Sequence, residues 1–249
     1  MNFVEKEPSK LILGSMRLLE SDWTLKQWVE FFVKIHGLGI EKIHSSMEYE
    51  SFDLFRAIIQ MLNDERPDVC FDHIVKIGNP HFDEASFQYE KLLSSIQSYC
   101  TALNTDKIGD LQWMWRSNLN DDEKRISLFQ KETDAIAKAA ETLKREGLID
   151  RVLCFPYSPA FAFAAVEADG IDGLAVYRNI NEPEYEPALA RCGELGKDAI
   201  IIRPFAAGSL VNGEKGSPKS LFDESLDMPA IEAAIVSSSN LDHIAELVH

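Results

Sequence analysis

The sequence has no long apolar run. Nothing along its 249 residues approaches the roughly 20 consecutive apolar residues of a membrane span. The segment from Met1 to Glu7 also lacks the basic-then-apolar order of a signal peptide. We therefore expect a cytoplasmic protein that does not act in a membrane.

Cysteine is scarce and scattered. The four cysteines, Cys70, Cys100, Cys154 and Cys192, form no C-x-x-C motif and have no histidine pair nearby. This spacing argues against a disulfide framework and against a metal cage. We expect no metal site and interpret each thiol as a small buried apolar residue.

Basic residues are outnumbered. The chain has 25 Lys and Arg against 41 Asp and Glu, which gives a net charge of −16. Such a charge disfavours nucleic acid and anionic membranes as partners. A small-molecule substrate fits better, and an anionic cofactor stays compatible because one basic pocket can exist within an acidic exterior. The sequence does not indicate an oligomeric state.

Short apolar runs alternate with amphipathic segments along almost the whole chain. Near-continuous apolar strands separated by helices are typical of a parallel sheet covered by helices. The expected strands are 11–14, 42–44, 73–77, 110–115, 152–155, 173–177, 199–202 and 234–236. The expected helices are 24–37, 52–63, 85–103, 132–147, 159–168 and 184–196. Segment 206–228, with Gly208, Gly213, Gly216 and Pro218, predicts a long loop.

Roughly eight strand–helix units in this length favour a closed (β/α)8 barrel, the TIM barrel, over a doubly wound sheet. No G-x-G-x-x-G motif opens a helix, which weakens the doubly wound alternative further. We predict one α/β domain spanning 1–249, with an outer ring of helices and an irregular seventh unit. Reactive residues of such barrels lie at the carboxyl ends of the strands.

Three side chains stand at the ends of successive predicted strands: Tyr49, Lys76 and Trp115. A tyrosine hydroxyl has an ordinary pKa of about 10. A neighbouring ammonium lowers that pKa by stabilising the phenolate, so Tyr49 and Lys76 together predict a proton donor. We expect the two side chains within hydrogen-bonding reach of each other or of one shared water. The alternative is a loop-edge aromatic and a solvated lysine.

Six segments, in order along the chain, resemble the aldo-keto reductase family. One is G-I-E-K-I-H-S-S-M-E-Y at 39–49, which is similar to the family pattern G-I-x-x-F-D-T-A-x-x-Y and puts Tyr49 at the proton-donor position. The others are L-G-S-M-R-L at 13–18, V-K at 75–76, L-K-R-E-G at 143–147, R-P-F-A-A-G-S-L at 203–210 and I-V-S-S-S-N-L-D-H-I at 235–244. The chain looks like a divergent, shortened member.

The resemblance implies a nicotinamide cofactor, for which NADP is our first expectation, with NAD or no cofactor as alternatives. The residues that it places around the cofactor are Arg203, Phe205, Gly208, Ser237, Ser238 and Asn240. It places Met16 and Trp115 in the substrate pocket. The serine run before Asn240 is both a natural helix cap and a natural anion site, and the two interpretations are compatible.

The chain departs from the family's Asp, Tyr, Lys and His tetrad. His44 stands at the aspartate position and Trp115 at the histidine position. His44 could orient Lys76 or relay protons, or be a satisfied polar residue at a strand end. Trp115 could equally be core packing. The contacts to the nicotinamide amide are also replaced, by Phe155-Pro156 and Ala175, and in the last segment Ser237 stands where many members have a lysine and His243 where an arginine is common.

These observations favour a divergent nicotinamide-dependent oxidoreductase that reduces a carbonyl-type substrate, with Tyr49 as acid, Lys76 tuning it and His44 assisting. Two alternatives stay open. One is a barrel that has lost redox chemistry and acts as a binding or regulatory subunit. The other is a non-redox enzyme that uses the same pocket for proton transfer by Tyr49 and His44.

Overall fold

The computed structural model describes residues 9–82, 84–116, 121–211 and 216–248. Eight strands form a closed barrel in which every strand runs parallel to its neighbours and β8 pairs back onto β1. The strands are β1 (Leu11–Gly14), β2 (Lys42–Ser45), β3 (Asp72–Gly78), β4 (Ile108–Met114), β5 (Ile149–Cys154), β6 (Gly173–Tyr177), β7 (Asp198–Ile202) and β8 (Ile231–Val236). The predicted barrel is confirmed.

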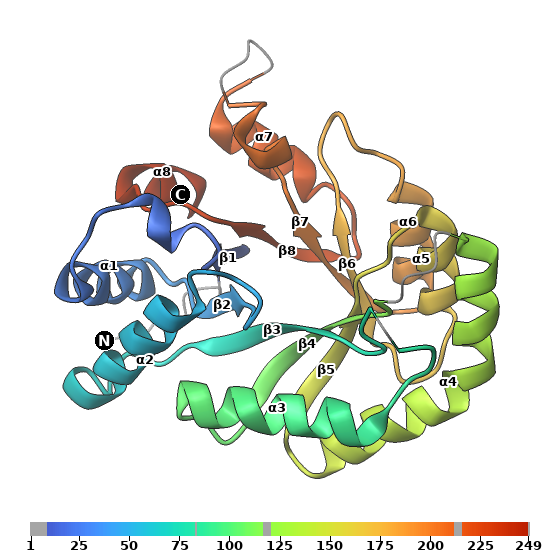
Figure 1. Cartoon of the computed structure of the whole chain (residues 1–249). Helices are drawn as coiled ribbons and strands as arrows, with labels where there is room; N and C mark the ends of the chain where they lie inside the picture. The colour runs from blue at the N-terminus through green and yellow to red at the C-terminus, as the bar shows by residue number, and fades with distance from the viewer. Residues whose placement is uncertain (1–8, 83, 117–120, 212–215, 249) are drawn as a thin grey trace, which may run out of the picture.

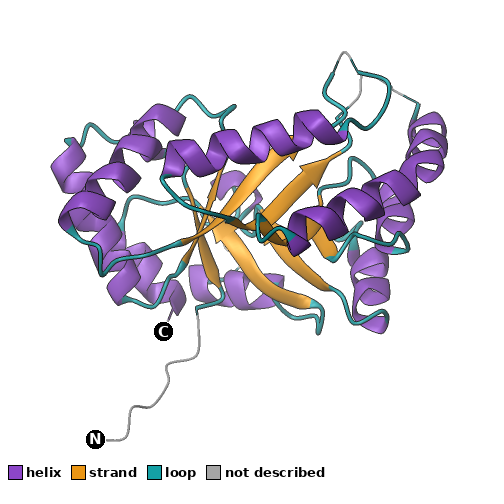
Figure 2. Cartoon of the chain, turned by 90° about the horizontal axis from the view of Figure 1, so that it is seen from below, coloured by secondary structure: helices purple, strands orange, loops and turns teal. Residues whose placement is uncertain are grey.

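Helices follow the strands and surround the barrel (Figures 1 and 2). They are α1 (Leu25–Gly37), α2 (Phe52–Glu65), α3 (Tyr89–Leu103), α4 (Asp122–Arg145), α5 (Pro159–Val166), α6 (Glu186–Glu194), α7 (Pro218–Ser225) and α8 (Leu241–Val248), with short 3-10 turns η1 (Leu18–Glu20) and η2 (Ala206–Gly208). None of these described helices combines the length and apolar character that crossing a membrane requires.

The structure differs most from the predicted elements in two places. Helix α4 begins well before position 132, because the Asp121 side chain accepts a hydrogen bond from the Lys124 amide and caps the helix start. The predicted loop 206–228 contains α7, which Ser217 caps and which has proline at its first position. Gly213, counted in that loop, lies outside the described residues.

The barrel has two apolar layers. Alternate strand residues point inward, where aliphatic side chains fill the barrel: Ile12, Ile74, Leu153, Ala175, Ile200, Ala233 and Ile235. The opposite faces of the strands pack against the helices, and there the largest aromatic side chains gather. The aliphatic residues fill only the middle of the barrel, and polar residues occupy its two ends.

The amino-terminal end of the barrel is closed by ion pairs. The Arg151 guanidinium, on β5, bonds both carboxylate oxygens of Asp110 on β4, at 2.8 and 2.7 Å. It also bonds Glu232 at 2.6 Å and Asp198 at 3.0 Å. Lys42 adds a contact of 3.4 Å to Asp110. Charged side chains from five strands therefore pair with one another at this end of the barrel.

Candidate functional site

The structure brings Tyr49, Lys76 and His44 together at the carboxyl-terminal end of the barrel. Tyr49 sits in the turn between β2 and α2, and its carbonyl accepts a hydrogen bond of 2.9 Å from the Phe52 amide. The Lys76 Nζ lies 4.7 Å from the centroid of the Tyr49 ring. The His44 and Tyr49 ring centroids are 6.0 Å apart. Tyr49 and Lys76 therefore meet as the strand ends predicted.

The contact between Lys76 and Tyr49 differs from the expected one. The ammonium lies over the ring face, a cation–π arrangement, and its ion-pair partner is the Glu48 carboxylate at 3.3 Å. Burial, followed by the neighbouring Tyr99 and Glu48, raises the pKa of the Tyr49 phenol. The predicted lowering of this pKa is wrong, because burial disfavours the charged phenolate and Glu48 adds to that effect, while Lys76 lies against the ring face.

His44 is buried and carries no charge at neutral pH. Burial and the nearby Lys76 ammonium lower the pKa of His44 to about 4, although the neighbouring Gln112 side chain acts in the opposite direction. Its Nε2 atom has no hydrogen-bond partner among the described residues. His44 therefore cannot replace an aspartate as the negative partner of Lys76. Burial also lowers the pKa of Lys76, with Glu48 acting in the opposite direction.

Sequence reasoning missed three residues of this cluster: Glu48, His81 and Arg116. The Glu48 carboxylate pairs with the Arg116 guanidinium and lies 3.2 Å from His81 Nε2. Arg116 in turn stacks over the Phe82 ring, 4.5 Å from its centroid. A signal was available, because Glu48 precedes Tyr49 directly and Arg116 follows the fourth predicted strand directly.

Trp115 does not line this site. Its side chain has no exposed surface and packs against Phe129 of α4 and Trp113, with ring centroids 6.0 and 6.3 Å away. Trp115 thus belongs to the layer between strands and helices, and the core-packing interpretation holds. Met16 is 54% exposed in the loop after β1, where a ligand at the barrel opening can reach it.

The loop after β7 carries the predicted cofactor residues Arg203, Phe205 and Gly208. The Arg203 guanidinium lies 5.0 Å from the Tyr177 ring centroid and 3.4 Å from Glu182. The backbone is left-handed at Arg203 (φ 61°), Ala206 (φ 47°), Ala207 (φ 57°) and Gly208 (φ 94°). Such strained turns cluster where backbone groups hold ligands. Phe205 instead packs toward α7, 6.4 Å from the Phe222 ring centroid.

The predicted anion segment, Ser237 to Asn240, forms a helix cap. The Asn240 side-chain oxygen accepts hydrogen bonds from the Asp242 and His243 amides, at 2.9 and 3.2 Å. These donors of α8 are thus already satisfied. A Cβ atom on Gly14 would lie 2.3 Å from Ser237 Oγ, so the ends of β1 and β8 approach closely. The segment therefore caps α8, and its role as an anion site stays a prediction.

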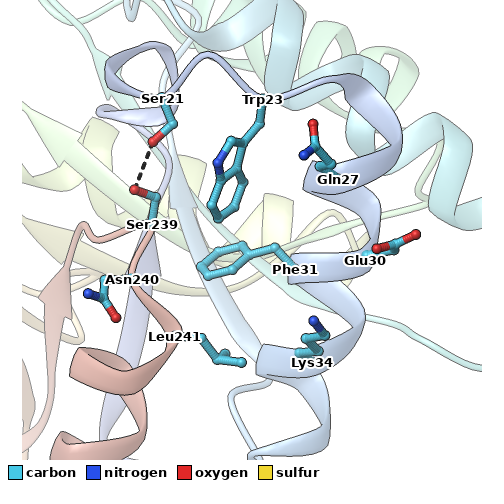
Figure 3. Close-up of a pocket in the computed structure, with 9 residues that line it drawn as sticks. All are labelled: Ser21, Trp23, Gln27, Glu30, Phe31, Lys34, Ser239, Asn240 and Leu241. Carbon is cyan, nitrogen blue, oxygen red and sulfur yellow. Dashed lines mark hydrogen bonds between the residues drawn. The ribbon is translucent and has the colours of Figure 1, made fainter.

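A cavity of about 620 Å³, which Tyr49 does not line, lies between α1 and the start of α8 (Figure 3). The Trp23 and Phe31 rings turn toward it, and Ser21 Oγ donates a 2.8 Å hydrogen bond to Ser239 Oγ at its edge. Ser239 and Asn240 are the link between this cavity and the predicted cofactor segment. Within the part of the chain that the structure describes, no group of three His, Cys, Asp or Glu residues could hold a metal ion.

Comparison with known proteins defines the fold. No protein-family profile and no curated protein matches the sequence. Solved structures do. A protein from Pseudomonas aeruginosa assigned as an aldo-keto reductase matches 97% of this chain and 89% of its own, with a TM-score of 0.73 and 21% identity. An aldo-keto reductase from Klebsiella pneumoniae, solved with NADP and acetate, matches 96% and 84%, with a TM-score of 0.69 and 16% identity. The chain therefore has the barrel fold of the aldo-keto reductases, with a sequence far from theirs.

Proposed function

We propose that the protein is a divergent NADP-dependent oxidoreductase that reduces a carbonyl-type substrate, with Tyr49 as proton donor. The observation that carries this proposal is the contact of Tyr49 with Lys76 at the carboxyl-terminal end of the barrel. The NADP complex of the Klebsiella pneumoniae aldo-keto reductase, which shares the fold, supports the choice of cofactor.

The residues present fit such a cofactor at its phosphate end. Arg203, whose side chain is 41% exposed, offers two parallel N–H donors to a phosphate, and the left-handed turn from Ala206 to Gly208 offers backbone groups beside it. The nicotinamide end has fewer contacts, because Phe155 and Ala175 are buried and have no side-chain hydrogen-bonding groups. The cofactor, when bound, would supply the hydride.

The chain's own residues would manage the proton. A raised pKa keeps the Tyr49 phenol protonated, which is the form that a donor needs. The same shift makes the phenol a weaker acid, so proton transfer to an ordinary aldehyde oxygen is slower. We therefore expect modest rates on common aldehydes and a preference for a substrate that accepts its proton more readily.

The test combines NADPH binding, followed by fluorescence, with NADPH oxidation over a panel of carbonyl compounds. Tyr49→Phe removes the proton and keeps the ring, so it should lower the rate about 10²–10⁴-fold. Tyr89→Phe, on α3 and away from the cluster, is the matched control and should keep the wild-type rate. Equal rates for wild type and Tyr49→Phe would remove Tyr49 from the mechanism.

Arg203→Ala should weaken NADPH binding roughly 10- to 150-fold, since a hydrogen bond to a charged group contributes about 1.5–3 kcal/mol. Lys219→Ala, a half-buried position on α7 that pairs with Asp223, should leave the affinity unchanged. Absence of NADPH binding by the wild type would favour the alternative of a binding or regulatory barrel, which the missing nicotinamide contacts also support. Tyr49-dependent proton exchange of a ketone without cofactor would favour the non-redox enzyme.

A further inference from the structure

Glu48 supplies the only carboxylate in contact with Lys76 among the described residues. We propose that Glu48 is a positioning residue, whose carboxylate holds Lys76 on the face of Tyr49 and ties that pair to Arg116 at the barrel opening. Its catalytic consequence rests on the function proposed above. Its structural part, the hold on Lys76, does not.

The turn that carries Glu48 is fixed relative to Lys76. The Met47 amide donates a hydrogen bond of 2.6 Å to the Tyr99 hydroxyl, and that hydroxyl donates to the Lys76 carbonyl at 3.2 Å. The Glu48 amide donates to Ser46 Oγ at 3.2 Å. Tyr99 therefore joins the β2–α2 turn to β3, so that Glu48 and Tyr49 arrive at Lys76 as one unit.

The Glu48 carboxylate is surrounded by basic side chains. Lys76, Arg116 and His81 face its carboxylate from β3, from the end of β4 and from the β3–α3 loop. Burial alone would raise the pKa of Glu48. Arg116, His81 and Lys76 together have the larger effect and lower this pKa, so the carboxylate stays ionised at neutral pH. His44 is neutral there and cannot take over this role.

Removing the charge has a defined consequence for each neighbour. In wild type, Glu48 raises the pKa of Lys76, while burial and Arg116 lower it. Without the Glu48 charge only the two lowering effects stay, so the neutral amine of Lys76 would become more populated. Tyr49 would lose a negative neighbour that raises the pKa of its phenol. Glu48 thus favours the protonated forms of both Lys76 and Tyr49, in addition to the burial that already raises the pKa of Tyr49.

The first experiment measures the Lys76 amine directly, without any redox assay. Wild type, Glu48→Gln and the control Glu50→Gln are labelled briefly with acetic anhydride between pH 6 and 10, and each lysine is quantified by peptide mass spectrometry. A change of one pKa unit alters the amine fraction about tenfold, so Glu48→Gln should label about tenfold faster at Lys76 at pH 7.5. Lys42 in every protein, and Lys76 in Glu50→Gln, should keep wild-type rates.

Glu48→Asp serves as the second variant, because it keeps the charge and withdraws it by one methylene. It should give an intermediate labelling rate and also covers the case in which Glu48→Gln does not fold. Unchanged Lys76 labelling in a folded Glu48→Gln or Glu48→Asp protein would overturn the proposed hold on Lys76.

The second experiment tests the catalytic consequence. Glu48→Gln should lower the turnover of NADPH-dependent reduction and move its alkaline limb to lower pH, with the KM for NADPH unchanged and partial recovery in Glu48→Asp. An unaltered pH profile in an active Glu48→Gln protein would overturn the positioning role. A wild type that neither binds nor oxidises NADPH would overturn the proposed function alone, because the labelling result stands by itself.

Discussion

The barrel has a polar cluster at each end, and the two are built differently. At the amino-terminal end Arg151 meets Asp110, Asp198 and Glu232, and the Asp110 side chain is only 5% exposed. At the carboxyl-terminal end Lys76, Glu48 and Arg116 are paired, but His44 Nε2 and Gln112 Oε1 lie buried below them without hydrogen-bond partners among the described residues. The first cluster is saturated, and the second keeps hydrogen-bonding capacity.

The difference shows how a structural ion cluster differs from a candidate site. Buried polar atoms normally find partners, so atoms left without them are candidates for contact with a ligand or water. Burial raises the pKa of Asp110, yet Arg151 and Lys42 hold it below its ordinary value. At the other end the pKa shifts of Tyr49 and His44 are set mainly by burial. Ion pairs stabilise the charged form of Asp110 at the amino-terminal end, whereas burial disfavours the charged forms of Tyr49 and His44 at the carboxyl-terminal end.

The largest expected effect breaks the saturated end. Arg151→Met removes the partner of a buried carboxylate, and breaking such a pair costs about 3–5 kcal/mol. We expect a loss of about that size in the free energy of unfolding, measured by urea denaturation, with NADPH binding retained in the folded fraction. Arg191→Met, whose ion pairs with Glu167 and Glu194 lie on the surface, is the control and should unfold close to wild type. Similar midpoints for the two variants would mean that the closed end is not what stabilises the barrel.

A smaller effect concerns acid, which should weaken the two ends in turn. His44 has a pKa of about 4 in the folded protein against an ordinary value of 6.5, so the unfolded chain binds more protons between these values. The contribution of His44 to the free energy of unfolding should be fully present above pH 6.5. It should fall by up to about 3 kcal/mol as the pH approaches 4. The buried His73 adds a loss over the same window. Asp110, with a lowered pKa, contributes stability that is lost only below about pH 4.

Urea denaturation at a series of pH values checks this order. His44→Gln should reduce the loss between pH 6.5 and 4 to the part that His73 contributes, and leave the loss below pH 4 in place. His243→Gln, an exposed position at the start of α8, should retain the full dependence. A His44→Gln protein as acid-sensitive as wild type would show that His44 takes up its proton without cost in the folded state.

The smallest expected effect concerns the strained turn at the carboxyl-terminal end. Ala207 has a left-handed backbone, which costs an L-residue about 1–2 kcal/mol. Ala207→Gly should relieve part of that strain and raise the free energy of unfolding by up to about 1 kcal/mol, measured by thermal unfolding. Ala164→Gly, inside α5, should do the reverse by about 1 kcal/mol. If both variants were less stable than wild type, the turn at Ala207 would be unstrained, and the two ends of the barrel would not differ in backbone strain.

Much of this architecture could be predicted from the chain. The alternation of apolar runs and amphipathic helices indicated the barrel, and the ends of the second and third strands indicated where Tyr49 and Lys76 would meet. The helix in 206–228 was missed because its cap and its proline stand among glycines, so local turn signals outweighed the short apolar pair Leu221 and Phe222.

The sequence did not determine whether the Trp115 side chain points into the barrel or toward the helices. Side chains alternate along a strand, so a shift of one residue moves the whole set to the opposite face. Register is set by pairing with the neighbouring strands, and here Gly78 of β3 pairs with Met114. Arg116 consequently reaches Glu48 at the barrel opening, while Trp115 packs against α4.

The sequence by itself determined the order of strands and helices, the closure into a barrel and the placement of Tyr49 and Lys76 at one end, because these follow from periodicity and from chain connectivity. Only the tertiary structure decided which charge Lys76 meets. Glu48 is adjacent to Tyr49 in the chain, but Lys76 and Arg116 come from other strands, and their approach depends on barrel closure. A pKa depends on burial and on distances to charges, and folding alone sets both.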